Sequence, residues 1–281
     1  MKSILIASLF LMVIYTPGKG QDPFSIYLEP LEISGFGGLQ SFAYGQHDGM
    51  WLLIGGRLDG LHRRQPWASF DEAGHNTQLT VVDPESGQVW TASVNALPTA
   101  IAEQLSSTNM QFTQNGNVLY AIGGYGYSAT AGDHITHPQL CAIDLPGAID
   151  AIVTGGAISP HFRAVTGENL AVTGGYLHQM DGKYYLIGGH RFDGRYNPMG
   201  GPSFTQEYTN ALRIFEITDD GSNLTAAMTD TWIDEAAFHR RDYNVAVQVM
   251  PDDSQGLTIF SGVFQPSADL PYLNAVNIGI D

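Results

Sequence analysis

Basic and aromatic side chains able to bind a ligand are concentrated in a few long segments between strand-like runs. Eight of the nine arginines and seven of the nine histidines lie in the segments 57–76, 125–137, 154–169, 190–208 and 230–242. Guanidinium groups bind carboxylates and phosphates through paired N–H donors. Because segments of this length are uncommon unless they are functional or disordered, their composition indicates one surface that meets an anion or a polar, carboxylate-bearing ligand.

The same arginines have an ordinary structural use, which is pairing with nearby carboxylates. The available partners in or beside the long segments are Asp59, Asp71, Asp193, Glu207 and Asp242. Such pairs would hold the segments in shape without any ligand. The sequence leaves both interpretations open.

Two stretches, 190–198 and 239–244, mix cationic, acidic and aromatic side chains. Arginines beside aromatic rings stack on sugars and bind carboxylates, whereas Tyr196 and Tyr243, taken singly, are more typical of packing between structural units. The predicted ligand-binding residues are Arg57, His62, Arg63, Arg64, His190, Arg191, Asp193, Arg195, Tyr196, His239, Arg240, Arg241, Asp242 and Tyr243.

Other chemical motifs are weak. His134 and His137 offer two imidazoles beside Asp133, but without a third spaced ligand no metal site is predicted. The sequence contains no nucleophile-elbow motif, no phosphate-binding loop and no dinucleotide fingerprint. Cys141 falls in an apolar run and is expected to be a small buried side chain. No catalytic residue is assigned and no cofactor is expected, so the sequence does not decide whether the chain is an enzyme.

A repeated pattern supplies the elements that would position the long segments. The stretches 41–56, 109–124, 176–189 and 245–262 each read as a strand, a turn and a second strand that ends in Gly-Gly or Ser-Gly. Asp48-Gly49, Asn115-Gly116 and Asp181-Gly182 accept the positive φ of a tight hairpin. Continuous apolar runs before the double glycines predict strands covered on both faces. The segments 79–90, 140–153 and 212–228 predict a third and a fourth strand, and 98–105 is the best helix candidate.

The apolar run into Gly-Gly, followed by a variable loop, Asp83-Pro84 and Trp90, resembles the kelch repeat. This resemblance implies an all-β fold, a β-propeller of four-stranded antiparallel blades in the superfamily of the galactose oxidase central domain. A single cysteine, Cys141, can form no internal disulfide, which in an exported chain of this size favours a secreted bacterial type. The resemblance covers roughly residue 39 to the end and is weaker after the first repeat, because the second and third repeats lack the tryptophan and the fourth has Ser261-Gly262 in place of Gly-Gly. The double glycines are also 65 to 73 residues apart, against about 50 in kelch proteins.

The predicted blades are 39–94, 106–154, 169–229 and 242–281, and two arrangements remain. The alternating segment 23–29 would provide an outer strand for the last blade and close a four-bladed ring. The favoured arrangement is that the four blades are part of a larger ring, since kelch-like rings usually need more blades.

The first twenty residues have the pattern of an export signal. Lys2 precedes an apolar run at 4–15 that is too short to span a bilayer, and Gly18 and Gly20 place small residues before a cut at Gln21. Without this segment the chain has 28 acidic and 10 basic residues, a net charge of −18. This charge argues against nucleic acid as a partner. A secreted, periplasmic or outer cell-surface protein is predicted, with no membrane insertion after cleavage.

Two functions from different classes follow. The favoured one is a non-catalytic module that binds a protein or carbohydrate ligand, including an anionic one, through the face rich in arginine and histidine. The alternative is an enzyme acting on an acidic sugar, which resembles the kelch-type sialic-acid mutarotases and epimerases. In that case Arg191, Arg240 or Arg241 would hold the carboxylate. The candidates for moving protons are His190, Asp193, Glu207, His239 and Asp242.

Overall fold

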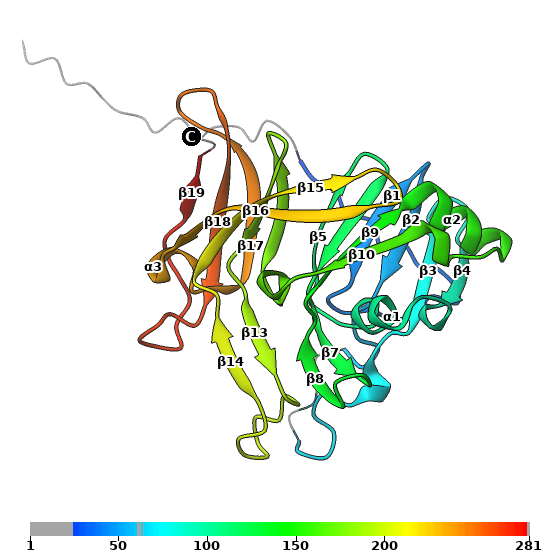
Figure 1. The fold of residues 1–281 in the computed structure, drawn as a ribbon, viewed down its shortest axis with the longest axis horizontal. Coiled ribbons are helices and arrows are strands. Elements are labelled where there is room, and N and C mark those ends of the chain that lie inside the picture. Colours follow the sequence, from blue (N-terminus) through cyan, green and yellow to red (C-terminus); the bar gives the residue numbers. More distant parts are fainter. Residues whose placement is uncertain (1–24, 61–62, 64, 280–281) are drawn as a thin grey trace, which may run out of the picture. The chain divides into compact units, whose positions relative to one another are not determined.

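The computed structural model describes residues 25–60, 63 and 65–279, so the predicted export signal lies outside the described residues. The chain divides into two units, 1–32 and 33–281. Within the first unit, residues 25–32 have no helix or strand, so the outer strand expected at 23–29 is not seen in its described part. The second unit is all-β and is built mainly from antiparallel sheets (Figure 1).

The first sheet contains four strands in their chain order, as predicted. They are β1 (Ala43–His47), β2 (Met50–Ile54), β3 (Gln78–Asp83) and β4 (Gln88–Ser93). His47 pairs with Met50, so Asp48 and Gly49 form a two-residue hairpin turn. Both turn residues have positive φ, 48° and 80°, which is the conformation that Asp-Gly favours.

The second sheet also has four strands, but its last strand differs from the prediction. Its members are β5 (Gln111–Asn115), β6 (Val118–Ile122), β9 (Gln139–Asp144) and β10 (Phe162–Thr166). The fourth strand expected before residue 154 is instead the helix α2 (Leu145–Thr154). Its buried Leu145, Ala148, Ile149 and Ile152 have the i, i+3, i+4, i+7 spacing of an amphipathic helix.

The third and fourth sheets continue the series. The third contains β11 (Tyr176–Met180), β12 (Lys183–Ile187), β15 (Ala211–Asp219) and β16 (Leu224–Ile233). The fourth has three strands in the described residues, β17 (Arg241–Val249), β18 (Gln255–Val263) and β19 (Val276–Ile278). Ser261 and Gly262 both have positive φ, as do the double glycines of the other sheets, so the fourth repeat keeps the backbone geometry of the first three.

Consecutive sheets pack face to face and bury the core between them. Leu119 and Ala121 of β6 belong to the cluster shared with the first sheet, whereas Tyr120 and Ile122 belong to the cluster shared with the third. A third cluster lies between the third and fourth sheets. The apolar strands of the second and third sheets are therefore covered on both faces, as predicted, whereas Trp51 of β2 and Phe260 of β18 are exposed. At the outer ends of the second and third sheets, Arg163 makes a two-bond ion pair with Asp219 at 3.0 and 2.7 Å.

The first strands of the first three sheets lie side by side, and a second backbone feature repeats where the first strand of each sheet begins. Ser41, Asn109, Gly174 and Asp242, which precede or begin these strands, all have φ between 55° and 65°. The amide of Asn109 donates to the carbonyl of Ser41, and the amide of Gly174 donates to the carbonyl of Asn109, both at 3.1 Å. These bonds join neighbouring repeats at the end of the sheets from which the long segments extend.

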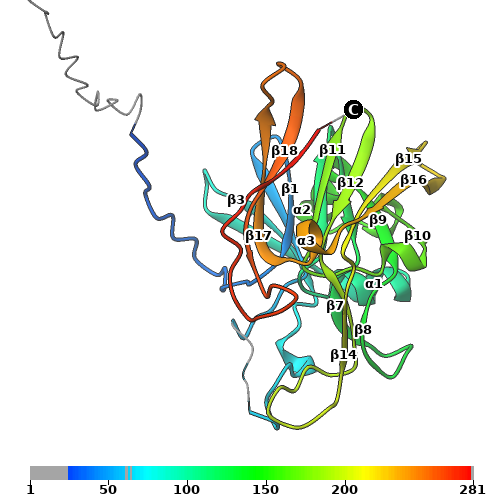
Figure 2. The ribbon, with the colours of Figure 1, turned by 90° about the vertical axis from the view of Figure 1, so that its left-hand side faces the viewer.

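The long segments have more regular structure than loops. Segment 125–137 contains the hairpin β7 (Tyr125–Ser128) and β8 (Asp133–Thr136), and segment 190–208 contains the hairpin β13 (His190–Asp193) and β14 (Thr205–Tyr208). Both hairpins extend from the same end of the sheets, toward the bottom of Figures 1 and 2. Segment 57–76 includes a 3₁₀ turn at Glu72–Gly74, and α3 (Glu235–Phe238) precedes β17. The predicted short helix is confirmed as α1 (Thr99–Leu105).

Candidate functional site

Three of the long segments are joined by an aromatic cluster of their own. We call segment 57–76 and the two hairpins β7–β8 and β13–β14 the loop platform. Phe70, Tyr125 and Phe192, one from each part, are at most 5 % exposed, and Tyr196 and Phe204 pack against them. The rings of Phe70 and Tyr125 are 4.7 Å apart, and those of Tyr125 and Phe192 are 5.0 Å apart. The platform therefore has a small core separate from those between the sheets.

Hydrogen bonds fix the same parts to one another. The Tyr125 hydroxyl donates to the carbonyl of Gly194 at 2.6 Å and accepts from the amide of Tyr196 at 2.8 Å. Burial raises the pKa of this hydroxyl, so it keeps its proton. Ser69 donates to the carbonyl of Tyr196, and Arg195 donates to the carbonyl of Ser69, which ties segment 57–76 to the β13–β14 hairpin.

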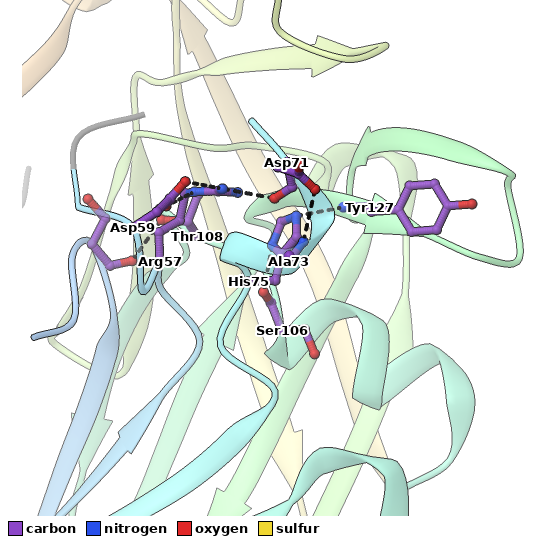
Figure 3. Close-up of polar contacts among 9 residues, drawn as sticks. Arg57, Asp59, Asp71, Ala73, His75, Ser106, Thr108 and Tyr127 are labelled. Carbon is purple, nitrogen blue, oxygen red and sulfur yellow. Dashed lines mark hydrogen bonds and ion pairs between the residues drawn. The ribbon is translucent and has the colours of Figure 1, made fainter. Parts of the chain in front are cut away.

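Arg57, the first of the predicted ligand-binding residues, is 3 % exposed and bonded internally (Figure 3). Its guanidinium donates to both carboxylate oxygens of Asp59 at 2.7 and 2.8 Å and to the carbonyl of Asp71 at 2.9 Å. It also lies over the ring of Phe70, 4.2 Å from the centroid. The bond from Arg57 lowers the pKa of Asp59. This arginine holds the turn of segment 57–76 rather than facing an opening.

Two more predicted arginines have internal partners. Arg191 is exposed and pairs with Glu168 at 2.9 Å and with Asp193 at 2.7 Å. Arg240 is 1 % exposed, donates to carbonyls that include those of Ser261 and Asn274, and stacks on a tyrosine ring. Pairing with carboxylates, the structural interpretation of the basic segments, thus describes Arg57 and Arg191, whereas Arg195 and Arg240 are held by backbone carbonyls.

Four histidines of the long segments are buried and have their pKa lowered mainly by burial. The pKa falls to about 4 for His75, His134 and His137 and to about 3 for His190. At neutral pH these rings are uncharged. The Nδ1 atom of His75 lies 3.1 Å from the carbonyl of Ser106, and its Nε2 accepts from the amide of Tyr127 at 3.4 Å (Figure 3). We refer to these four residues as the buried histidines.

A pocket of about 110 Å³ lies where the platform meets the first strands of the third and fourth sheets. Its aromatic side is formed by Phe70, Tyr125, Phe192 and Tyr196. Its polar side is formed by Asn109, Thr173, Gly174, His190, Arg241 and Asp242. The pocket thus lies between Gly174 and Asp242, the third and fourth members of the series of left-handed residues.

Two buried nitrogen atoms of the pocket residues are not used within the described structure. Neither Nδ1 of His190 nor Nε of Arg241 has a hydrogen-bond partner there. The Arg241 guanidinium stacks over the Phe264 ring at 4.2 Å, and its Nε is 3.8 Å from a carboxylate oxygen of Asp242. The Asp242 side chain is 72 % exposed. An unpartnered, buried donor therefore lies beside an exposed acceptor.

The structure brings four of the predicted residues together in this pocket, namely His190, Tyr196, Arg241 and Asp242. Arg57, Arg191, Asp193, Arg195 and Arg240 make the internal contacts of the platform and the fourth sheet, and Tyr243 donates to the carbonyl of Ile187. His239 stacks on Tyr208 at 3.8 Å. Arg63 lines a separate surface depression beside segment 57–76, and His62 and Arg64 lie outside the described residues.

Sequence reasoning missed six pocket residues, which are Phe70, Asn109, Tyr125, Thr173, Gly174 and Phe192. A signal for two of them was present, because Asn109 and Gly174 occupy the position of Asp242 in their own repeats. Asn, Asp and Gly are the residue types that most readily adopt positive φ.

Among residues 25–60, 63 and 65–279 there is no group of three or more His, Cys, Asp or Glu side chains placed to hold a metal ion. No helix in that part of the chain is long and apolar enough to cross a membrane.

Comparison of the sequence with models of known protein families gives no match, and comparison with curated proteins gives none either. The functional argument therefore depends on the site itself.

Proposed function

We propose that the chain is a secreted, kelch-type propeller module that binds a protein or carbohydrate ligand on its loop platform. The main support is that segments far apart in the sequence form one ordered platform around a pocket. The hydroxyl of Tyr125, for example, bonds to both Gly194 and Tyr196 of another repeat. A pre-formed pocket with aromatic walls and a few placed polar groups is the usual form of a small-ligand site.

The kelch interpretation has separate support. Each of the four consecutive antiparallel sheets has a left-handed residue before or at the start of its first strand and a pair of residues with positive φ at or just after the end of its second. Repetition of both features in register is expected if the sheets are blades of one kind. Export would give the acidic chain an extracellular setting.

The experiment is isothermal titration of the full chain with a panel of neutral and acidic oligosaccharides. Arg241→Gln removes the charge at the pocket, and Arg191→Gln makes the same change on an exposed arginine that does not line it. We expect a saccharide to bind the unaltered chain and Arg191→Gln equally and Arg241→Gln at least tenfold more weakly. If no saccharide binds, the carbohydrate part of the proposal is wrong. If both variants bind normally, the pocket is not the site.

An enzyme acting on an acidic sugar is the second candidate, because His190, Arg241 and Asp242 meet in one pocket. The buried His190 is a weak base, with a pKa lowered to about 3, and Arg191 and Arg240 have internal partners. These features favour binding over proton transfer. Proton NMR of the anomers of an acidic sugar tests the enzyme directly, since a mutarotase speeds their exchange above the rate in buffer.

A further inference from the structure

The polar atoms of the pocket define what kind of ligand fits it. The side chain of His190 is buried, with 7 % exposure, and its Nδ1 has no partner within the described structure. The Nε–H donor of Arg241 is likewise unused. A buried polar atom without a partner destabilises the folded chain. A ligand that bonds to these atoms would remove this destabilisation.

The charges of the pocket argue against an anion. The Arg241 guanidinium is offset by the Asp242 carboxylate 3.8 Å away. A ligand carboxylate placed at Arg241 would therefore meet a negative charge as well as a positive one. The chain as a whole carries a net charge of −16, and this field opposes the approach of anions. A neutral ligand that both accepts and donates hydrogen bonds fits these charges better.

The size and walls of the pocket suggest a small ring. A volume of about 110 Å³ equals that of about four water molecules in the liquid, so the pocket can hold only part of one small ring. Phe70, Tyr125 and Tyr196 contribute aromatic side chains to the lining of the pocket. A sugar ring has an apolar C–H face and adjacent hydroxyls, so it presents one kind of surface to each side of the pocket.

We propose that the pocket binds the terminal pyranose of a neutral glycan through two adjacent hydroxyls. One hydroxyl accepts from Nε of Arg241, and its neighbour donates to the carboxylate of Asp242. His190 contacts a third polar group, and the C–H face of the ring lies against the aromatic wall. This inference rests on the proposed carbohydrate-binding function and specifies its ligand as neutral.

The test uses the carboxylate that distinguishes the two kinds of sugar. Asp242 has φ of 55°, which asparagine also adopts, so Asp242→Asn removes the charge and preserves the backbone. Asp253→Asn is the matched control, because Asp253 is also an exposed aspartate with positive φ (67°), in the turn at the other end of β17. Thermal unfolding of both variants verifies that they fold.

Titration calorimetry is run with the methyl glycosides of glucose, galactose and mannose and with glucuronic acid. We expect at least one neutral glycoside to bind the unaltered chain and Asp253→Asn within twofold of each other, and Asp242→Asn about tenfold more weakly. Glucuronic acid should bind weakly and should gain affinity in Asp242→Asn, because a repulsive charge is removed.

Three results would overturn the inference. If glucuronic acid binds more tightly than every neutral glycoside, the pocket recognises a carboxylate. The ligand is then an acidic sugar, and the proposed carbohydrate-binding function is retained. If Asp242→Asn and Asp253→Asn weaken a neutral glycoside equally, the effect comes from overall charge and not from the pocket. If no monosaccharide binds at millimolar concentration, the pocket does not bind a terminal pyranose. The proposed carbohydrate-binding function is then tested separately by the oligosaccharide titration.

Discussion

Replacing Tyr125 by phenylalanine should loosen the loop platform without disturbing the sheets. The substitution removes the bonds to Gly194 and Tyr196 and leaves the aromatic contacts in place. A typical intramolecular hydrogen bond contributes about 1 kcal/mol net, and an unpaired buried group costs about 1–3 kcal/mol. We therefore expect the docking of the β13–β14 hairpin to weaken by about 2 kcal/mol. This is roughly a thirtyfold increase in the population of the open form.

Amide hydrogen exchange measures this opening directly. The amide of Gly194 donates to the carbonyl of His134 at 2.8 Å, a bond that the substitution does not touch, so its exchange rate reports hairpin docking. Tyr127→Phe is the control, since it removes a hydroxyl that points away from the labelled contacts in the same β7–β8 hairpin (Figure 3). We expect the exchange of Gly194 to accelerate ten- to a hundredfold in Tyr125→Phe only. Unchanged protection, or equal acceleration in both variants, would refute the role of this hydroxyl.

Three further outcomes are expected. Asp219→Ala should lower the free energy of unfolding by about 3 kcal/mol in urea titration, because it leaves Arg163 unpaired. The side chains of Arg163 and Asp219 are only 13 % and 6 % exposed. A loss below 1 kcal/mol would show that the ion pair adds little to stability. The buried histidines have lower pKa values in the folded chain than the usual 6.5, so the unfolded chain binds more protons between about pH 6.5 and 4. Stability should therefore be full above pH 6.5 and fall as the pH decreases, on the order of 1–2 kcal/mol per histidine at pH 5, and a flat urea midpoint from pH 7 to 5 would contradict their burial. Gly123→Ala should prevent cooperative thermal unfolding, because an added Cβ at φ of 63° would collide with the carbonyl of Val172, whereas Gly116→Ala, where a Cβ meets open space, should remain folded.

The sheets were predictable because their signals are local. Asp48-Gly49 and Asp181-Gly182 form turns at the residues expected, and the apolar runs of the second and third repeats are covered on both faces. The α2 helix was also visible in principle, since Leu145, Ala148 and Ile149 have helical spacing. The prediction of a strand here was wrong because these apolar residues have the period of a helix, although the segment holds the position of a fourth strand in the other repeats.

The platform was not predictable in the same way, because its contacts join residues far apart in the chain. Ser69 and Tyr196, which are 127 positions apart, share a hydrogen bond. The composition of the segments correctly marked where charged groups gather, yet it did not show that Arg57 would bond to Asp59 while Arg241 would keep an unused donor. Which arginine is available depends on burial and on partners supplied by other repeats.

The location of the pocket follows from how the repeats are joined. Ser41, Asn109 and Gly174 are linked in turn by backbone bonds, and the fourth equivalent position is Asp242. The pocket lies between the last two members of this series, so a ligand there would contact the third sheet through Gly174 and His190 and the fourth through Arg241 and Asp242. Binding would then stabilise the contact between these sheets, because a ligand held only by the joined form favours that form. Thermal unfolding monitored at Trp232 of β16 should consequently shift upward with a ligand that fits, and the shift should disappear in Asp242→Asn.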